Sequence, residues 1–353
     1  MNYGLPYMGS KSKIVKKIVS LFPNADTFVD LFAGGGAVTH YAMTTNKYKH
    51  FVYNDLNPLM PKAFEMALNG EFENETRWIS REDFFRLRDT DPYAAICFSF
   101  GNNLSNYMYS KDLEPIKEAY HYAIFFDDYS LAKERMGIDL SPLSKCATIE
   151  EKYALLKRIV KSTPPQFSRN KVAVGRARVA SPRSSQNYEA YKRFTGISKV
   201  WNVVNGAFYP PQYISKTQKE ERGWLTLEDT ASDESLKHRL SDVVAFHNTD
   251  YENVPIPKDS VIYCDPPYVN TAKYQSHKKK DFDYDRFYDW AEKQEVPLFI
   301  SEYWMPEDRF KCIAEIPRTS SYSQYNNAQK IVEKIYVPVR SKYYKMEQLS
   351  LFS

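Results

Sequence analysis

The sequence has little of what marks secreted, membrane-spanning or metal-binding proteins. Its four cysteines lie far apart without paired spacing, and the opening residues, MNYGLPYMGSKSK, contain no apolar signal region. No segment approaches the roughly 20 apolar residues that cross a bilayer, and the six histidines show no metal-ligand spacing. We therefore expect a cytoplasmic protein with reduced thiols, no membrane segment and no bound metal.

The net charge and the aromatic content exclude fewer classes of protein. The formal net charge is +4, which is too small to name a partner, because the local distribution of charge decides whether a polyanion binds. The 353 residues suit one large domain with an insertion, or two domains. The 28 tyrosines and 21 phenylalanines exceed what a core accommodates, so we expect some of these rings at the surface, available for stacking.

The two ends of the chain alternate between strand-like and helix-like segments. Residues 27–60 read as a strand (TFVDLF), a glycine turn (AGGG), a helix (AVTHYAM) and a second strand (HFVYND). Further on, SVIYCD and VPLFIS are typical of buried strands, RFYDWAEKQ of a helix between them and KIVEKIYVPV of a late strand. The pattern predicts that both ends contribute to one α/β sheet with parallel strands.

The middle of the chain, from about residue 72 to 240, loses this alternation. It holds two helical stretches, EPIKEAYHYAIFF and IEEKYALLKRIVK, followed by the breaker-rich STPPQFSRNKVAVGRARVASPRSSQ. We interpret it as an inserted domain. The predicted division gives one domain built from residues 1–72 and 241–353, with the insertion at 73–240.

The stretch FVDLFAGGGAV places an acid before a glycine-rich turn between a predicted strand and helix. Asp30 is followed at steps of two by Phe32, Gly34 and Gly36. Glycine lets the backbone approach a ligand closely, and a helix N-terminus presents free amide hydrogens. A dinucleotide-binding turn needs a third glycine where this chain has Thr39, so a pyrophosphate is disfavoured, and the acid favours an ammonium group.

A second acid follows the turn at the spacing of a ribose-binding carboxylate. Asp55 closes the next predicted strand, where a carboxylate can accept both hydroxyls of a ribose. Together with the glycine turn, it indicates an adenosine-bearing, positively charged cofactor such as S-adenosylmethionine. An ordinary tight turn with a solvated Asp55 is the alternative.

A third acid stands where the strand-like VIYC runs directly into DPPY. Pro266 and Pro267 fix their own φ angles and remove two backbone donors, so the carbonyls here and the Asp265 carboxylate present only acceptors. Tyr268 adds a flat face for a planar base. Together these residues predict a pocket for an exocyclic amine on an aromatic ring. The alternative is a proline-ended strand whose acid caps a nearby turn.

In this order, the segments resemble the DNA adenine-N6 methyltransferases of the alpha group, the Dam-like enzymes. FVDLFAGGG is similar to their cofactor motif and CDPPY to their catalytic motif, with a long insertion between them. PYMGSKSKI is similar to their N-terminal cofactor segment, YNDLN to their ribose motif and FHNTDYENV to the segment that holds the cofactor adenine. The resemblance covers the two outer parts of the chain, and the family's usual GATC-reading signature is not found in the middle.

The resemblance implies a Rossmann-like class I methyltransferase sheet, formed by the catalytic parts 1–72 and 241–353, with an inserted, largely helical target-recognition domain at 73–240. It implies S-adenosylmethionine as cofactor and double-stranded DNA as partner, in a bacterial or phage-encoded protein without an obligate protein partner. The implied catalytic residues are Asp265, Pro266 and Tyr268, and the implied cofactor-binding residues are Tyr7, Lys11, Asp30, Phe32, Ala33, Gly34, Gly36, Asp55, Asp250 and Tyr251.

For the chemistry, the resemblance implies that Asp265 and the Pro266 carbonyl accept the two hydrogens of the adenine amine, whose nitrogen then takes the methyl group directly. Lys11 stands in place of the lysine that meets the methionine carboxylate of the cofactor. The adenine has to leave the duplex stack, and Tyr268 stacks on it. Cys264 points to the opposite side of the strand from Asp265, and we interpret it as a core thiol.

Other functions remain open on the sequence. The acid of DPPY favours adenine in DNA over cytosine N4, RNA adenine or protein glutamine as the methyl acceptor. A non-catalytic nucleic-acid-binding protein on the same scaffold is a further alternative, and a nicotinamide oxidoreductase is disfavoured by the missing third glycine.

Residues that contact DNA are predicted from composition. No acid occurs between Lys152 and Tyr188, where arginines accumulate, and HKKK at 277–280 follows the DPPY segment. The asparagines of FSFGNNLSNYMYSK, residues 98–111, are suited either to reading adenine edges or to building a turn. The candidates are Asn102, Asn103, Arg169, Lys171, Arg176, Arg178, Arg183, Lys278 and Lys279, with solvated loops as the alternative. The target sequence and any companion restriction enzyme are not predicted.

Overall fold

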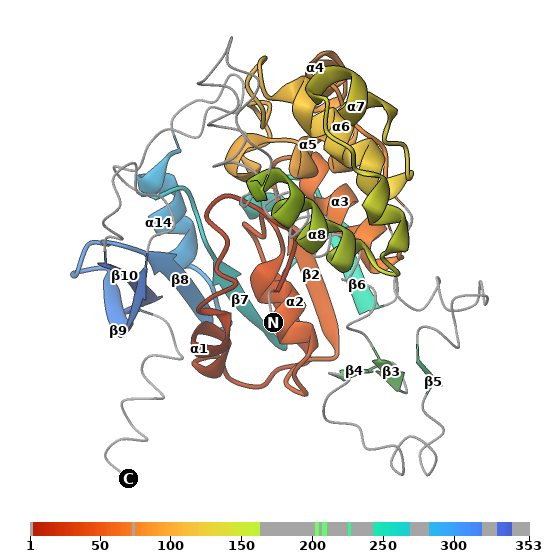
Figure 1. The fold of residues 1–353 in the computed structure, drawn as a ribbon. Helices are drawn as coiled ribbons and strands as arrows, with labels where there is room; N and C mark the ends of the chain where they lie inside the picture. The colour runs from red at the N-terminus through yellow and green to blue at the C-terminus, as the bar shows by residue number, and fades with distance from the viewer. Residues whose placement is uncertain are drawn as a thin grey trace. The chain divides into compact units, whose positions relative to one another are not determined.

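The structure is a computed structural model that describes residues 3–72, 75–162, 243–268, 282–319 and 330–340, and the backbone of three short strands between 202 and 226. The chain divides into two compact units (Figure 1). The first consists of Met1–Glu71 and Gly196–Ser353, and the second of Phe72–Thr195. Within the described ranges, every helix is too short or too polar to cross a membrane.

A seven-stranded sheet organises the first unit, as Figure 1 shows. Five neighbouring strands run parallel, in the spatial order β6-β2-β1-β7-β8, and β10 then pairs antiparallel with both β8 and β9. The α/β sheet expected from both chain ends is confirmed. Its strands are β1 (Thr27–Asp30), β2 (His50–Asn54), β6 (Val244–His247), β7 (Ser260–Cys264), β8 (Leu298–Glu302), β9 (Phe310–Thr319) and β10 (Lys330–Pro338).

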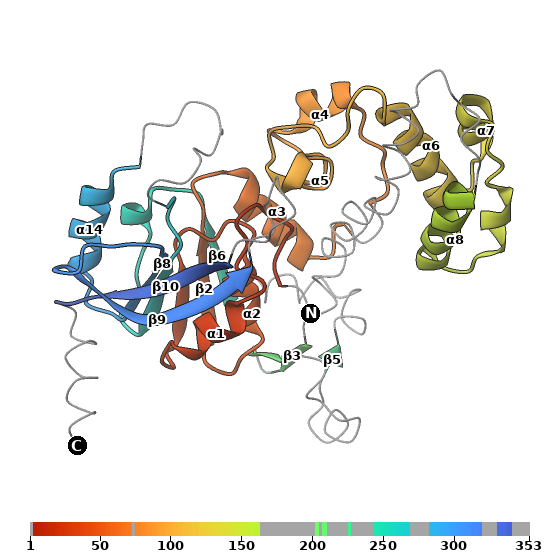
Figure 2. The same cartoon turned by 60° about the vertical axis from the view of Figure 1, so that its left-hand side comes forward.

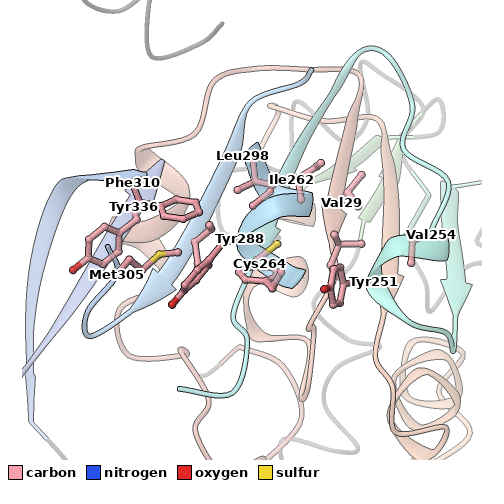
Figure 3. Close-up of a cluster of buried hydrophobic side chains, with 14 of the residues drawn as sticks. Val29, Tyr251, Val254, Ile262, Cys264, Tyr288, Leu298, Met305, Phe310 and Tyr336 are labelled. Atoms are coloured by element: carbon pink, nitrogen blue, oxygen red, sulfur yellow. The ribbon is translucent and has the colours of Figure 1, made fainter. Parts of the chain in front are cut away.

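Helices and loops cover both faces of the sheet, which explains the nearly continuous apolar sequence of its central strands. Every position of β1, β7 and β8 is buried, as parallel strands between two layers require. On one face, Phe22 packs on rings of β1, β7 and β8 beside α1 (Val15–Ser20) and α2 (Ala37–Met43). On the other face, α14 (Tyr284–Glu292) packs its Tyr288 with Val29, Ile262 and Leu298 (Figure 3).

The strand order contains one reversal of direction. From β1 the chain moves outward through β2 to β6, then returns to place β7 on the other side of β1 and continues to β8. In open α/β sheets, ligands bind beyond the carboxyl ends of the strands at such a switch point. Asp30, the last residue of β1, and Asp265, the first residue after β7, therefore stand on either side of the expected binding position.

The N-terminal segment lies across the glycine turn between β1 and α2. The amide of Leu5 donates to the carbonyl of Gly35 at 2.6 Å, and the amide of Gly4 donates to Nδ1 of His40 at 2.8 Å. Gly36 begins α2 in a left-handed conformation, with φ of 68°. A second stretch of backbone therefore packs directly on the glycine turn. Further along the chain, α3 (Leu59–Leu68) follows β2.

The second unit is helical in its described residues. Ser80 caps α4 (Arg81–Leu87), Asp91 caps α5 (Pro92–Cys97), and a short η1 (Phe100–Asn102) follows. The two helices expected from the sequence are confirmed as α6 (Glu114–Phe125) and α8 (Ile149–Ser162), and they share a core with α7 (Ser130–Met136) and η2 (Ser141–Lys145) (Figures 1 and 2). Small residues such as Ala119, Ala123 and Ala132 let these helices approach closely.

Three short strands form a separate antiparallel sheet in the order β4-β3-β5. They are β3 (Asn202–Val204), β4 (Ala207–Tyr209) and β5 (Leu225–Thr226).

The Gly4→Ala substitution tests how closely the N-terminal segment packs on the turn. A Cβ atom at Gly4, whose φ is +69°, would lie 2.5 Å from the backbone nitrogen of Ala37 and 2.5 Å from the carbonyl oxygen of Gly35. We expect a loss of about 2 kcal/mol or more in the free energy of unfolding, measured by chemical denaturation. The control is Gly70→Ala, which has a similar φ of 74° at the end of α3. Equal losses in the two variants would contradict the close packing.

Candidate functional site

Acidic residues stand at the carboxyl ends of all five parallel strands. Asp30 ends β1 and Glu302 ends β8, while Asp55 and Asp265 directly follow β2 and β7, and Asp250 follows β6. Because these strands are neighbours, the sheet collects the acids along one edge. The motif residues of the two chain ends are therefore brought to the same side of the first unit.

Lys11, from the N-terminal segment, lies against the tip of β7. Its ammonium donates to both carboxylate oxygens of Asp265, at 2.8 and 2.6 Å, and lies 4.8 Å from the centroid of the Tyr268 ring. The side chain of Lys11 is 5% exposed and that of Asp265 is 19% exposed, so the carboxylate is the member of the pair that faces solvent. The lysine expected beside the cofactor is thus bonded to the carboxylate expected beside the substrate amine.

The β9–β10 hairpin adds a second carboxylate behind this pair. Glu333, in β10, is completely buried; its Oε1 lies 3.8 Å from the Lys11 ammonium and accepts a hydrogen bond from the Tyr268 hydroxyl. Arg318 of β9 forms an ion pair with Oε2 of Glu333 at 3.0 Å and donates to the hydroxyl of Tyr303 at 2.9 Å. The Tyr303 ring in turn meets the Tyr268 ring edge-on, with centroids 4.6 Å apart.

Burial and charge oppose each other in this cluster. Burial lowers the pKa of the Lys11 ammonium, but the charges of Asp265 and Glu333 outweigh burial, so the pKa lies above its ordinary value. Burial raises the pKa of the Glu333 carboxyl, and the charge of Asp265 adds to this, while Lys11 and Arg318 oppose it. Lys11 is therefore firmly charged, and Lys11 and Arg318 together favour the charged form of Glu333 against the effect of burial.

Asp30 is an almost wholly buried carboxyl at the end of β1. Its Oδ2 accepts a hydrogen bond from the Thr39 hydroxyl at 2.7 Å, whereas its Oδ1 has no hydrogen-bond partner among the described residues. Burial, reinforced by the charges of Asp265 and Asp55, raises the pKa of Asp30 to about 7, although the Thr39 hydrogen bond opposes this. A buried acceptor left over in this way fits a cationic donor such as an ammonium group.

The glycine turn and Asp55 are joined by backbone hydrogen bonds. The amide of Gly34 donates to Oδ2 of Asp55 at 2.9 Å, and the amide of Asn57 donates to Oδ1 at 2.8 Å. Ala33 donates its amide to the last carbonyl of β2 at 2.9 Å. A Cβ atom at Gly34 would lie 2.9 Å from the ring of Tyr7, so this glycine makes room for the tyrosine. Asp55 therefore fixes the turn as well as being placed for a ligand.

Tyr251 and Asp250 occupy the outer end of the sheet edge. The Tyr251 ring is buried in the core and lies 5.5 Å from the ring of Phe32. Asp250 caps the short helix η7 (Tyr251–Asn253) and accepts a hydrogen bond from Arg286 of α14 at 3.1 Å. The Arg286 guanidinium also pairs with Glu252 and lies 5.5 Å from the Tyr251 ring centroid, so α14 holds both expected cofactor residues.

The remaining residues of the DPPY segment divide between core and surface. Cys264 is fully buried in the cluster of Figure 3, where burial raises the pKa of its thiol, and the expected core thiol is confirmed. Pro266 is buried and Pro267 is exposed, and the hydroxyl of Tyr284 donates to the Pro267 carbonyl at 2.9 Å. The segment is therefore tied to α14 beyond the carboxylate.

Asn102 and Asn103 belong to the second unit and take part in the hydrogen bonds of their own loop. Asn102 donates from Nδ2 to the Ile96 carbonyl at 3.0 Å, and Oδ1 of Asn103 accepts from the amides of Ser105 and Asn106 at 2.9 and 3.0 Å. These hydrogen bonds fit the turn-building alternative, and contact of the two asparagines with DNA stays a prediction. The other candidates for DNA contact lie outside the described residues: Arg169, Lys171, Arg176, Arg178, Arg183, Lys278 and Lys279.

Several side chains at the site are absent from the motifs. Glu333 has a signal in the sequence, since it is a lone acid at an inward-facing position of the strand KIVEKIYVPV. Thr39 stands out in the sequence only as a missing glycine, and its hydroxyl contact with Asp30 follows from the fold. Arg318 and Arg286 have no sequence signal. Among the residues that the structure describes, no cluster of histidine, cysteine and acidic side chains is suited to hold a metal ion.

Comparison with known proteins gives two similarities. Residues 7–127 match the family described as D12 class N6 adenine-specific DNA methyltransferase. A stretch of 61 residues is 39% identical to Modification methylase StsI of Streptococcus sanguinis, and it covers 17% of this chain and 9% of that protein. The chain thus aligns with a small part of this relative, and the resemblance read from the motifs is confirmed. The family match ends at residue 127, before the strand that leads to Asp265.

The buried carboxyl of Asp30 predicts a pH dependence of stability. Its pKa is raised from 3.8 to about 7 in the folded protein, so the folded state holds the proton more tightly than the unfolded state. Its contribution to stability is therefore largest at low pH and is lost as the pH rises toward 7, by up to about 1.4 kcal/mol per pH unit. We expect Asp30→Asn to be more stable than the parent protein at about pH 8 and to lose this advantage toward about pH 5.

Thermal unfolding across this range measures the effect. The control is Asp26→Asn, whose carboxylate is 36% exposed just before the same strand. If the difference between Asp30→Asn and the parent protein were independent of pH, the carboxyl would not titrate in this range.

Proposed function

We propose that this chain is an S-adenosylmethionine-dependent DNA methyltransferase that modifies the N6 amine of adenine in a short duplex site. The observation that carries the proposal is the pair of carboxyls at the switch point of the sheet. Asp30 is buried, with one oxygen that has no hydrogen-bond partner among the described residues, and Asp265 is partly exposed at the tip of the neighbouring strand. The family match of residues 7–127 supports the same activity.

The residues along the sheet edge fit the proposed cofactor. The unpartnered Oδ1 of Asp30 suits the ammonium group, Asp55 the ribose hydroxyls, and Asp250 with Tyr251 the adenine. When bound, S-adenosylmethionine supplies a methyl group activated by its positively charged sulfur. The set that would hold it is Tyr7, Lys11, Asp30, Phe32, Ala33, Gly34, Gly36, Asp55, Asp250 and Tyr251.

The residues after β7 are assigned to the adenine. Its amine is a poor nucleophile because the nitrogen lone pair is delocalised into the ring. Asp265 and the Pro266 carbonyl accept the two amino hydrogens, which favours a pyramidal nitrogen with its lone pair available. Asp265 acts as an acceptor more than as a strong base, because the amine becomes acidic only as the new bond forms. Most of the rate enhancement then comes from positioning and from the placement of charge.

The adenine has to reach these residues from a stacked duplex. Extrusion of the base costs a few kcal/mol in lost stacking and pairing. Stacking on the Tyr268 ring returns about 1 to 3 kcal/mol. The second unit, whose range includes the arginine-rich stretch, is assigned to recognition of the duplex, in a cytoplasmic enzyme that acts alone or beside a restriction enzyme.

The function is tested by incubating the protein with labelled S-adenosylmethionine and unmethylated genomic DNA. Nucleoside analysis and sequencing that maps modified bases then identify the product. We expect N6-methyladenine at one short motif. Label on cytosine N4, on RNA or on protein would show that adenine in DNA is not the methyl acceptor. Cofactor binding without methyl transfer would favour a non-catalytic binding protein on the same scaffold.

Replacing Asp265 by Asn tests its assignment to the amine. The variant exchanges a carboxylate oxygen for an amide donor, and we expect the single-turnover rate to fall about 100- to 1,000-fold. The Kd for S-adenosylmethionine, measured by calorimetry, is expected to change by less than about threefold. The matched control is Cys264→Ala, on the preceding residue, which should retain transfer. A parallel loss of cofactor affinity in Asp265→Asn would assign this carboxylate to the cofactor instead.

The affinity for the cofactor is expected to depend on pH through Asp30. With a pKa of about 7, this carboxyl is protonated in the free protein at lower pH and must ionise to receive an ammonium group. The affinity should therefore rise with pH toward about 7, by up to tenfold per unit, and then level off. Calorimetry on the parent protein and on Asp30→Asn measures this, and the variant should bind weakly at every pH. If the affinity of the parent protein for S-adenosylmethionine did not change across this pH range, Asp30 would not be the residue that binds the ammonium group.

A further inference from the structure

We propose that Glu333 is a positioning residue for the reaction, holding Lys11 and Tyr268 so that Asp265 keeps the capacity to accept the substrate amine. The inference rests on the proposed function, because it concerns the same reacting carboxylate. Glu333 lies on the β9–β10 hairpin, beyond the motifs and beyond the matched residues 7–127.

The position of Glu333 is costly for a carboxylate and would suit an apolar side chain. Its side chain is 0% exposed, and Ile331 and Ile335 occupy the neighbouring positions on the same face of β10. Replacing a buried ion pair by apolar residues of similar volume is often neutral or stabilising. Packing therefore does not explain this acid, and its contacts point to Lys11, Tyr268 and Arg318.

The first contact concerns the sharing of the Lys11 ammonium. Lys11 donates to both oxygens of Asp265, the same oxygens that would accept a hydrogen of the adenine amine. Glu333 offers the ammonium a second carboxylate at 3.8 Å. With Arg318 added, two acids face two cations, and the group is neutral. Without the charge on Glu333, Asp265 would be the carboxylate left to balance the Lys11 ammonium, which also lies 3.5 Å from the Gly9 carbonyl oxygen. The amine nitrogen would then gain positive charge in a cationic surrounding.

The second contact fixes the ring that is assigned to the base. The Tyr268 hydroxyl donates to Glu333, and the Tyr268 ring stands at 85° to the ring of Tyr303, with centroids 4.6 Å apart. The Tyr303 hydroxyl in turn accepts a hydrogen bond from Arg318. The tyrosine is therefore held by a hydrogen bond at its hydroxyl and by a contact with the ring of Tyr303. One buried carboxylate thus connects the lysine on Asp265 with the ring that follows Asp265.

Substitutions at position 333 separate charge from shape. Glu333→Gln keeps the size and can still accept from Tyr268, but it loses the charge that Lys11 faces. Glu333→Asp keeps the charge and loses reach. Glu315→Gln is the control, because this acid lies on β9 of the same hairpin, 60% exposed, and pairs with Lys334 at 3.3 Å. Each protein is compared by thermal unfolding, by the Kd for S-adenosylmethionine, and by kcat and KM on DNA.

We expect Glu333→Gln to lower kcat by about tenfold or more, with KM for DNA and the Kd for the cofactor within about threefold of the parent values. Glu333→Asp should retain more activity than Glu333→Gln, and Glu315→Gln should match the parent protein. Three results would overturn the inference. They are a kcat of Glu333→Gln equal to that of the parent protein, a lower kcat in Glu333→Asp than in Glu333→Gln, or a loss of cofactor affinity in Glu333→Gln as large as its loss of kcat.

Tyr268→Phe provides a second test that leaves the buried charges in place. It removes only the hydroxyl that donates to Glu333, and we expect kcat to fall about threefold or more with unchanged cofactor affinity. If Glu333→Gln does not fold, this variant decides, and an unchanged kcat would overturn the inference. Failure of the proposed function can be distinguished from failure of this inference, because the parent protein itself would then leave adenine unmethylated. In that case the inference about Glu333 would fail as well.

Discussion

The parallel pairing of β1 with β7 is the contact on which the rest of the site depends. The two strands come from opposite ends of the sequence, and their register sets Asp30 opposite Tyr263, two residues before Asp265. That register places one carboxyl inside the sheet edge and the other at its solvent side. A slip of β7 by one residue would turn Asp265 to the opposite face of the sheet, where Cys264 now packs in the core.

Each acid along the edge is held in a different way, and this gives each a different chemical character. Burial raises the pKa of Asp30 to about 7 against the opposing hydrogen bond from Thr39, whereas Asp55 accepts hydrogen bonds from two backbone amides and Asp265 from the Lys11 ammonium. Glu333 is tolerated only beside two cations. One sheet edge can therefore present acceptors to a cation, to hydroxyl groups and to an amine without these groups being interchangeable.

Much of the fold and part of the site follow from the sequence. Buried parallel strands have nearly unbroken apolar sequences, so β1, β7 and β8 can be predicted from the sequence. The turn residues that follow β1 and β7 then single out Asp30 and Asp265 as candidate site residues. The partners of those residues are not visible, because contacts between distant segments leave no local pattern. Lys11 is expected beside the cofactor, and in the structure its ammonium donates to Asp265. Arg318 and Arg286 reach the site only because the β9–β10 hairpin and α14 pack against it. The asparagines at 102 and 103 matched two patterns; the loop shows the hydrogen bonds of a turn, and contact with DNA stays a prediction.

The segment that lies over the glycine turn has a consequence for the order of events during synthesis. Lys11 leaves the ribosome long before its two carboxylate partners, because Asp265 lies 254 residues further along the chain and Glu333 comes after it. Until then, the lysine and the glycine turn lack the strands that complete their surroundings. Pairings of such long sequence separation form slowly, because the chain between them must first be closed into a loop. The growing chain therefore carries an incomplete sheet edge until β7 and the β9–β10 hairpin have been synthesised.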